Sequence, residues 1–397
     1  MTRRRTERDT PGIGLYVHVP FCRRKCRYCD FYSRPPQENP AELDRFVAAA
    51  AREAELRSEG VRLSGQADTF PPVGTVYLGG GTPSMLGAER LVTLLDAARD
   101  RLDVSSDAEI TVEANPLDVT PGWAGAARAA GFNRISIGVQ SVIEEDLRFL
   151  GRLHRAPDGP RAVETAQHAG FDEIGVDLIY GLPEQTPGML RERISRALDA
   201  CRPTHVSAYQ LTYHAGTPLW DELRAGRCRR LSEDEEYALF VTLHEELAGR
   251  GYRAYEVSNF SLADEHRSRH NSNYWRHVPY IGLGPSAHSF DPPVRSWNVS
   301  DIGAYCSALE GGSLPTEGSE TLSDDQLAAE MVMLALRTTD GLDLGRYGER
   351  FGRDFLEANE AAVQSAIDRG RLVVAGSHLR PTRDGLAVAD RLAAELT

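Results

Sequence analysis

The chain has 397 residues, of which 41% are hydrophobic and 26% charged, and its formal net charge is −13. This length predicts about two or three domains with a large buried core, and the acidic balance argues against nonspecific binding to nucleic acid or anionic membrane. No apolar run of about 18 residues occurs, so no integral membrane segment is expected, and a cytoplasmic protein with reduced cysteines is predicted.

The first 230 residues alternate between short apolar runs and longer segments with helical periodicity. The predicted strands are Gly14–His18, Thr75–Leu78, Glu109–Glu113, Arg134–Gly138, Glu173–Ile179 and His205–Gln210. The predicted helices are Pro40–Ser58, Ala88–Arg101, Pro121–Ala130, Glu144–Leu150, Gly159–Ala169 and Gly188–Cys201. This alternation predicts an α/β fold with a parallel sheet. Periodicity alone fits an incomplete (β/α)6 barrel and a flat doubly wound sheet equally well.

The pattern changes after about Gly226. Ser232–Arg250 predicts a capped helix, and the stretch Asn259–Pro293 has few periodic segments, which is typical of a segment packed over a site. A linker is expected at Gly311–Gly318, and helices followed by two short strands then predict a C-terminal, mostly helical, winged-helix-like module. The expected organisation is a flexible N-terminus (1–12), a partial barrel (13–230), an accessory segment covering the barrel (231–310) and the C-terminal module (319–397).

Three cysteines, Cys22, Cys26 and Cys29, follow the first predicted strand with the spacing C-x3-C-x2-C. Their thiolates can converge on one soft metal centre that keeps a position open for another ligand. The spacing fits an iron–sulfur cluster, and the alternative is a zinc site completed by a distant histidine or by Cys201. Because the cysteines follow a strand, the site is expected at the carboxyl end of the sheet.

Glycines and polar residues follow other predicted strands. Residues 79–83 read Gly-Gly-Gly-Thr-Pro. Such a turn either leaves backbone N–H groups free to bind an anion or is simply a tight turn. Glu113, Gln140 and Asp177 lie at the ends of later strands, where polar groups contact a ligand or cap the next helix.

The cysteine loop, with an aromatic residue before its last cysteine, resembles the radical S-adenosylmethionine (radical SAM) enzymes. The resemblance implies an incomplete parallel (β/α)6 barrel in which the cysteines hold three irons of a [4Fe–4S] cluster. It also implies that the fourth iron binds S-adenosylmethionine and that the Gly-Gly-Gly-Thr-Pro turn contacts the methionine amino group. A low-potential electron donor such as flavodoxin or ferredoxin would reduce the cluster and start cleavage of the ligand to a 5′-deoxyadenosyl radical.

Further motifs point to one branch of this family. The resemblance to that branch covers roughly residues 13 to 390. They are Tyr16-Val-His-Val-Pro-Phe-Cys, Gly138-Val-Gln-Ser and Asp177-Leu-Ile-Tyr-Gly-Leu-Pro. These motifs resemble the branch that contains oxygen-independent coproporphyrinogen III oxidase and the heme chaperone subfamily HemW.

Two positions favour the chaperone subfamily. The oxidase has a further cysteine two positions after the last cluster cysteine, where this chain has Phe31. His270-Asn-Ser-Asn-Tyr-Trp275 also matches the H-N-x-x-Y-W motif of the HemW subgroup. The resemblance implies binding of heme as cargo and its delivery to heme-accepting proteins. The alternative is the oxidase itself, which decarboxylates its substrate to protoporphyrinogen IX. A winged-helix regulator that senses iron–sulfur status is less favoured, because the chain is acidic.

The motif match also implies which residues of this chain contact the ligands, although it assigns no catalytic residue. Residues that match contacts to the cluster-bound S-adenosylmethionine are Tyr16, Gly80, Gly81, Thr82 and Glu113. Residues that match a second S-adenosylmethionine site of the oxidase are Tyr28, Gln140, Arg152 and Asp177. His270 is predicted as an axial ligand of heme, with Tyr274 and Trp275 as an apolar wall; the alternative is a hydrogen-bonded histidine in a domain contact. His288 is a second candidate ligand.

Overall fold

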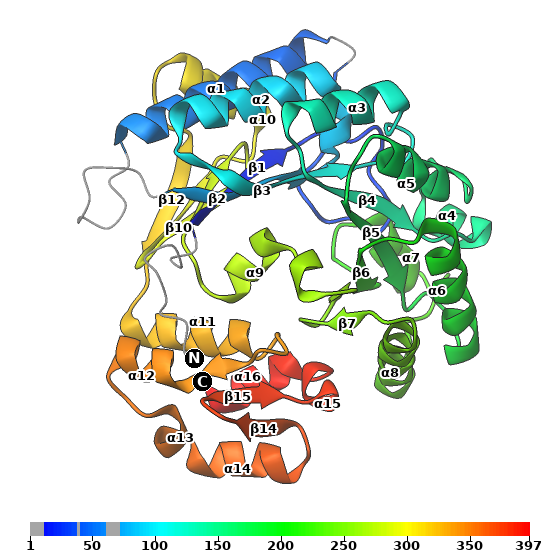
Figure 1. The fold of residues 1–397 in the computed structure, drawn as a ribbon, viewed down its shortest axis with the longest axis vertical. Coiled ribbons are helices and arrows are strands. Elements are labelled where there is room, and N and C mark those ends of the chain that lie inside the picture. The colour runs from blue at the N-terminus through cyan, green and yellow to red at the C-terminus, as the bar shows by residue number, and fades with distance from the viewer. Residues whose placement is uncertain (1–11, 38–39, 61–71) are drawn as a thin grey trace, which may run out of the picture.

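A computed structural model describes residues 12–37, 40–60 and 72–397. All of the expected flexible N-terminus except residue 12 lies outside these residues. The described chain contains a twelve-stranded, mostly parallel sheet with the strand order β12-β11-β10-β9-β1-β2-β3-β4-β5-β6-β8-β7 (Figure 1). Its central strands are β1 (Ile13–Val19), β2 (Val73–Gly80), β3 (Val104–Ala114), β4 (Arg134–Gln140), β5 (Glu173–Tyr180) and β6 (His205–Gln210). The helices between them are α1 (Ala41–Gly60), α2 (Ala88–Arg101), α3 (Pro121–Ala130), α4 (Glu144–Leu150), α5 (Asp158–His168) and α6 (Pro187–Cys201).

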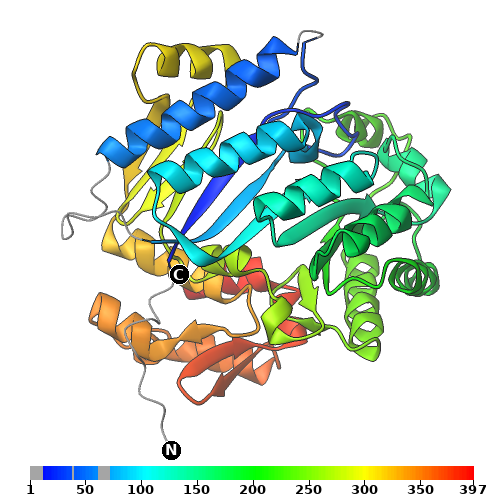
Figure 2. The same cartoon turned by 45° about the horizontal axis from the view of Figure 1, so that its top comes forward.

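The strand order decides between the two folds that periodicity left open. Strands β1 to β6 are parallel neighbours in chain order. A doubly wound sheet would instead reverse its direction of growth at a switch point and carry helices on both faces. When each right-handed crossover adds the next strand on the same side of the previous one, all the helices lie on one face of the sheet. Figures 1 and 2 show α1 to α6 along the outside of a curved sheet. The sheet ends at β12 and β7 among the described strands, so the predicted incomplete barrel is confirmed.

The central strands alternate apolar and polar side chains. In β5, Ile174, Val176 and Leu178 are buried in the main hydrophobic core, whereas the intervening Asp177 points into the barrel and lines its cavity. Successive residues of a strand face opposite sides, so the apolar set packs under the helices and the polar set lines the interior. The fold therefore collects polar groups from several strands in one internal space.

The stretch Asn259–Pro293 contains more structure than predicted. Strands β7 (Arg253–Ala254) and β8 (Asn259–Ser261) extend the sheet beyond β6, and β9 (Tyr280–Leu283) joins the other edge, parallel to β1. Beyond β9 lie β10 (His288–Asp291), β11 (Val294–Asn298) and β12 (Thr316–Thr321), all antiparallel to their neighbours. The expected accessory segment therefore widens the sheet at both edges. Residues 316–318 of the expected linker belong to β12.

Four helices accompany these strands. They are α7 (Pro218–Arg224), α8 (Glu233–Gly249), α9 (Arg269–Trp275) and α10 (Ile302–Glu310). Helix α9 carries the His270–Trp275 motif and packs against β1, β2 and α11, so it lies between the barrel and the C-terminal helices (Figure 1). Helix α8 begins at a capping box formed by Ser232 and Glu235.

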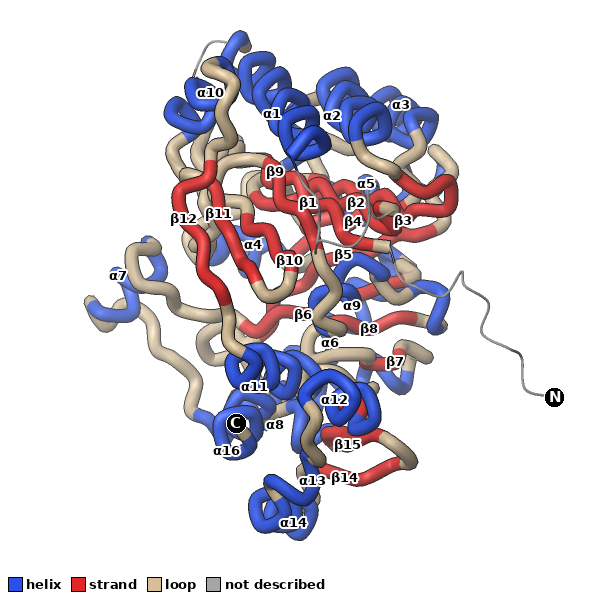
Figure 3. Tube along the Cα trace, turned by 90° about the vertical axis from the view of Figure 1, so that its left-hand side faces the viewer, coloured by secondary structure: helices blue, strands red, loops and turns tan. Residues whose placement is uncertain are grey.

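The C-terminal region has its own hydrophobic core, separate from that of the barrel. Its helices are α11 (Asp324–Ala335), α12 (Leu344–Phe351), α13 (Phe355–Ala358), α14 (Glu360–Asp368), α15 (Arg383–Leu386) and α16 (Ala389–Leu396). Strands β13 (Leu342–Asp343), β15 (His378–Pro381) and β14 (Leu372–Ala375) form a small antiparallel sheet beside them (Figure 3). The region is mostly helical, as predicted. Within the described residues, no helix combines the length and apolar character needed to cross a membrane.

Candidate functional site

A cavity of about 410 Å³ opens at the carboxyl ends of the central strands. The predicted site residues that line it are Cys22, Cys26, Tyr28, Cys29, Gly80, Gly81, Thr82, Glu113, Gln140, Arg152 and Asp177. They come from the loop after β1 and from the ends of β2, β3, β4 and β5, together with Arg152 after α4. Residues far apart in the sequence thus meet around one space, at the edge of the sheet where ligands bind in parallel α/β folds.

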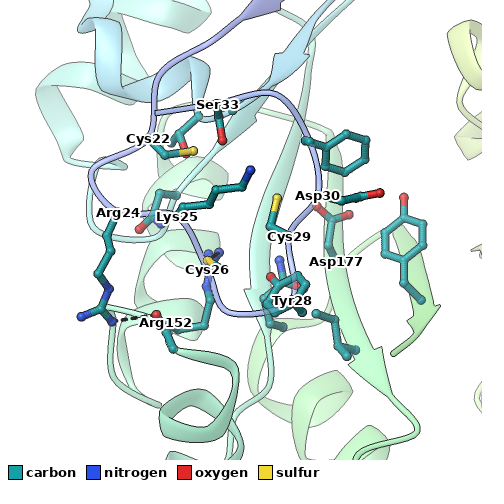
Figure 4. A pocket seen from close by; sticks show the side chains of 18 of the residues that line it. Cys22, Arg24, Lys25, Cys26, Tyr28, Cys29, Asp30, Ser33, Arg152 and Asp177 are labelled. Carbon is teal, nitrogen blue, oxygen red and sulfur yellow. Dashed lines mark hydrogen bonds between the residues drawn. The ribbon is translucent and has the colours of Figure 1, made fainter. Parts of the chain in front are cut away.

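The cysteine loop is anchored on its outer side by arginines. Arg23 forms an ion pair with the buried Asp118, and Asp118 also accepts a hydrogen bond from Ser84. Arg24 donates to the backbone carbonyl of Gly151 at 2.7 Å, as the dashed line in Figure 4 shows. With these side chains held by neighbouring loops, the three thiols lie around the cavity (Figure 4).

The thiols suit a multi-iron cluster better than a single ion. Among the described residues, no three histidine, cysteine or acidic side chains come close enough to hold one metal ion. In a [4Fe–4S] cluster each cysteine binds a different iron, so its ligands lie further apart than those of one zinc ion. Thr82 Oγ1 lies 3.3 Å from Cys22 Sγ, and the Arg152 guanidinium donates to Cys26 Sγ at 3.4 Å. Hydrogen bonds of this kind to cluster thiolates tune the cluster potential.

Burial makes Cys29 a poor thiolate without a metal. Desolvation raises the pKa of Cys29 to about 11, so this thiol is neutral at physiological pH in the metal-free protein. Metal ligation requires the thiolate, and a bound cation supplies the charge that favours it. Loading of the site should therefore release protons.

The glycine turn does not offer free N–H groups to an anion. The Gly80 N–H donates to the Glu113 carboxylate at 3.2 Å, and the N–H groups of Gly81 and Thr82 donate to the carbonyls of Val19 and Phe21 at 2.8 and 2.7 Å. A Cβ on Gly81 would stand 2.5 Å from the Phe21 carbonyl oxygen. Of the two alternatives, this conformation therefore fits the tight turn, because the glycines let the turn pack closely on the segment that leads into the cysteine loop.

Buried acidic groups give the inner end of the cavity a negative character. The Tyr77 hydroxyl donates a hydrogen bond to the Glu113 carboxyl at 2.8 Å, and the Ser136 hydroxyl donates one to the Asp177 carboxyl at 3.0 Å. Desolvation and the nearby Asp177 raise the pKa of Glu113 to about 7, and burial likewise raises the pKa of Asp177. Two buried carboxyl groups close to each other favour a cationic ligand, and the ammonium and sulfonium of S-adenosylmethionine are cationic.

Tyr28, Gln140 and Arg152, three of the residues that match a second ligand site, line the cavity together with Asp177. Arg152 donates to the Gly138 carbonyl at 2.7 Å as well as to Cys26. Burial raises the pKa of the Tyr28 hydroxyl, although the neighbouring Arg152 charge opposes this shift. Gln140 ends β4 with a φ of 64°, the left-handed region that a non-glycine residue adopts at some energetic cost. This strained backbone turns the end of β4 toward the cavity.

Tyr16 and His270 lie outside the cavity lining. The Tyr16 hydroxyl lies 3.0 Å from His18 Nδ1, and its ring stacks on Tyr77, whose hydroxyl reaches Glu113. Tyr16 therefore lies beside the cavity, close enough for the Glu113 charge to help raise its pKa, which burial raises most.

His270 is 1% exposed and lies beneath the barrel on α9. Its Nδ1 is 2.9 Å from the Thr75 hydroxyl and its Nε2 is 3.0 Å from the Tyr274 hydroxyl. Burial lowers its pKa to about 3, so the ring is neutral. Because both ring nitrogens are hydrogen-bonded, neither is available to heme iron in this conformation, and the structure matches the alternative of a hydrogen-bonded histidine. His288 lies on β10, away from the cavity, with its ring 5.9 Å from that of Trp297.

Several functional residues were missed from the sequence. Tyr77 and Ser136 hold the two acidic side chains, and Asp118 anchors the cysteine loop. The signal for Tyr77 and Ser136 is present in the sequence, because each is a polar residue between apolar residues of a strand. Asp118 lies in a loop without periodicity, and only the folded structure brings it to Arg23.

Fold and site together define a radical SAM protein. A model of the Radical SAM superfamily matches residues 16–197, and a model of the HemN C-terminal domain matches residues 322–388. Coproporphyrinogen III oxidase (HemN) from Escherichia coli, a radical SAM enzyme, has a similar structure, with a TM-score of 0.81 over 97% of this chain and 90% of that chain. The two sequences are 21% identical, so this likeness concerns the fold.

Sequence relatives narrow the class further. The heme chaperone HemW of Mycobacterium tuberculosis is 37% identical over 386 residues, which cover 96% of this chain and 94% of that protein. The heme chaperone HemW of Bacillus subtilis is 30% identical and covers 94% of this chain and 96% of that protein. The chain therefore belongs to the HemW family of radical SAM proteins.

Proposed function

We propose that this protein is a heme chaperone that binds heme as cargo, together with a [4Fe–4S] cluster and S-adenosylmethionine, and delivers heme to acceptor proteins. The observation that carries this proposal is the 37% identity to the heme chaperone HemW of Mycobacterium tuberculosis over nearly the whole length of both chains. Residue 31 supports the same conclusion. It is a phenylalanine, 65% exposed at the cavity, where the related oxidase carries a cysteine.

The residues of the cavity have distinct roles in this proposal. Cys22, Cys26 and Cys29 would hold the cluster, which supplies a low-potential electron and an open iron for S-adenosylmethionine. Glu113 and Asp177 would hold the cationic end of that ligand by charge and hydrogen bonding. The barrel wall and the helices outside it would shield one side of this space from water, and the space opens at the carboxyl ends of the strands.

Electron donor, acceptors and compartment are also part of the proposal. A low-potential donor such as flavodoxin or ferredoxin would reduce the cluster. Proteins that need heme would take it from this chain. All six cysteines are free, which supports action in the reducing cytoplasm.

One anaerobic experiment on the reconstituted protein tests the function. Heme titration should give saturable binding with a stoichiometric Soret band, and incubation with coproporphyrinogen III, S-adenosylmethionine and a low-potential reductant should give no protoporphyrinogen IX. The Cys22→Ala variant should lose the broad visible absorbance of the cluster, while Cys228→Ala, a control outside the cavity, should keep it. Protoporphyrinogen formation by the wild type would instead favour the oxidase.

The same titration tests the role of His270. Because its ring is buried and both nitrogens are occupied, we expect the Soret maximum of the His270→Ala variant to match that of the wild type. Thermal unfolding should detect a loss of stability, since the substitution leaves the Thr75 and Tyr274 hydroxyls without their partner. A shifted Soret band in a variant with unchanged circular dichroism would restore His270 as an iron ligand.

A further inference from the structure

A second cavity, of about 320 Å³, lies between the barrel and the C-terminal region. Its wall on the barrel side comes from α9 and the segment around Tyr255, and its other wall comes from α11, β13, α12 and β15. Figure 1 shows α9 between the sheet and α11, so the shape of this cavity depends on both parts of the chain. The cavity is distinct from the cysteine-lined cavity, because the two share no lining residue.

The lining of this second cavity is rich in arginine. Arg267, Arg276, Arg346 and Arg380 line it, against two acidic residues, Asp340 and Asp343. Arg267 pairs with Asp340 at 3.3 Å, and the Asp343 carboxylate caps α12. The other three arginines form no ion pair with any described residue. In a chain with a net charge of −13, this local excess of positive charge favours an anionic ligand.

The same cavity has a flat aromatic side. Tyr255 and Trp275 both line it, and the Arg267 guanidinium lies 5.5 Å from the Tyr255 ring centre. The Trp275 indole N–H is buried and has no hydrogen-bond partner among the described residues. A buried donor without an acceptor is costly, so a ligand oxygen in the cavity would satisfy it. The cavity thus combines an aromatic wall, an unsatisfied donor and free guanidinium groups.

We propose that this cavity binds the propionate edge of heme. This inference rests on the proposed function. Two propionates match the local excess of positive charge, guanidinium groups bind carboxylates in a bidentate manner, and an aromatic wall suits the flat ring. A volume of about 320 Å³ is near the lower end for ligand pockets. The cavity would therefore hold one edge of the ring and leave the remainder accessible to an acceptor protein.

Heme titration of an Arg346→Gln/Arg380→Gln double variant tests this proposal. Loss of two guanidinium partners should weaken heme binding at least tenfold, because charge-assisted hydrogen bonds to the propionates are removed. Heme with esterified propionates should bind equally weakly to the wild type and the variant. The matched control is Arg161→Gln/Arg191→Gln, which changes two exposed arginines on α5 and α6 and should bind heme like the wild type.

The outcomes separate this inference from the proposed function. Wild-type protein that fails to bind heme would overturn both. If the double variant folds and binds heme with the same affinity as the wild type, the assignment of this cavity is wrong, while the proposed function as a heme chaperone stands. If the wild type binds heme and its esterified form with equal affinity, the cavity assignment is also wrong, because the propionates then do not contribute to recognition. Arg276→Gln provides a second variant if the double variant does not fold, and it should show the same loss of affinity.

Discussion

Glu113 is an acidic side chain in a buried site, where the loss of water disfavours its charged form. Its carboxyl faces Asp177 inside the barrel and receives hydrogen bonds from Tyr77 and the Gly80 backbone. Desolvation and the acidic neighbour outweigh these bonds and raise its pKa to about 7. The metal-free, ligand-free protein thus holds a proton that the unfolded chain would release near the ordinary glutamate value.

This shift has a direct consequence for stability. Between about pH 4.5 and 7 the folded state binds more protons at Glu113 than the unfolded state, so the group's contribution to stability falls as pH rises through this window. We expect the Glu113→Gln variant to match the wild type at low pH and to become more stable above pH 7, by up to roughly 3 kcal/mol. Thermal unfolding of the apo proteins across this pH range measures the difference. A difference that is independent of pH would contradict the raised pKa.

The sequence predicts the position of some site residues in the fold but not that of others. The cysteines, Glu113 and Asp177 could be placed at the cavity because strand ends in a parallel sheet converge. His270 could not be placed, because its role depends on burial by α9 and on the hydroxyls of Thr75 and Tyr274, which the sequence pattern does not show. The sequence could not decide between the two alternatives for the glycine turn for a similar reason, since its N–H groups bond to Val19, Phe21 and Glu113 in the folded chain.

At the scale of elements, one buried carboxylate joins α1 to the antiparallel part of the sheet. Glu53 of α1 is fully buried and accepts hydrogen bonds from Arg57, Asn298, Tyr305 and the Gly284 backbone N–H, at 2.7–2.9 Å. These donors belong to α1, β11, α10 and the residue after β9. A buried charge with this many partners fixes the geometry of the elements around it.

The Glu53→Gln substitution should therefore be strongly destabilising. It removes the charge opposite Arg57 and replaces an acceptor by a donor in a fully buried site, at a cost of about 3 kcal/mol or more. The control is Glu55→Gln, at a partly exposed carboxylate two residues away that pairs with Arg52 and Arg101, and it should cost about 1 kcal/mol or less. Urea unfolding monitored by circular dichroism compares them. Similar midpoints for both variants would show that the network adds little.

Elements with clear periodicity or clear end signals were predicted well, whereas the short strands from β7 to β11 were not. Helices α2, α3 and α4 have the predicted boundaries, because clear apolar periodicity and glycine or proline at their ends define them. Strands β7 to β11 are two to five residues long and carry too few residues for a period to be seen. Their existence depends on the edges of a sheet that the first strands have already formed.

At the scale of the whole molecule, the sheet brings together the beginning of the chain and residues near position 280. Strand β1 pairs with β2 on one side and with β9 on the other. Without β9, the backbone of residues 14–17 in β1 would form an open edge next to apolar side chains, and such edges promote association.

This pairing predicts how truncated chains refold. A chain ending at Pro279 lacks β9, whereas a chain ending at Asp301 keeps β9, β10 and β11, and both lack the C-terminal region. We expect the shorter chain to aggregate more during refolding from urea, because its β1 edge stays unpaired. Light scattering at equal concentration measures this difference. Equal scattering by the two chains would show that β9 does not protect this edge.

The position of β9 in the sequence also matters during synthesis on the ribosome. The second neighbour of β1 is made roughly 260 residues after β1 itself, which takes roughly 15–50 s at ordinary translation rates. Over that interval the nascent barrel has an open edge beside the loop that carries the cluster cysteines. The loop that carries the cluster cysteines therefore follows a strand that has both of its neighbours only after β9 has been made.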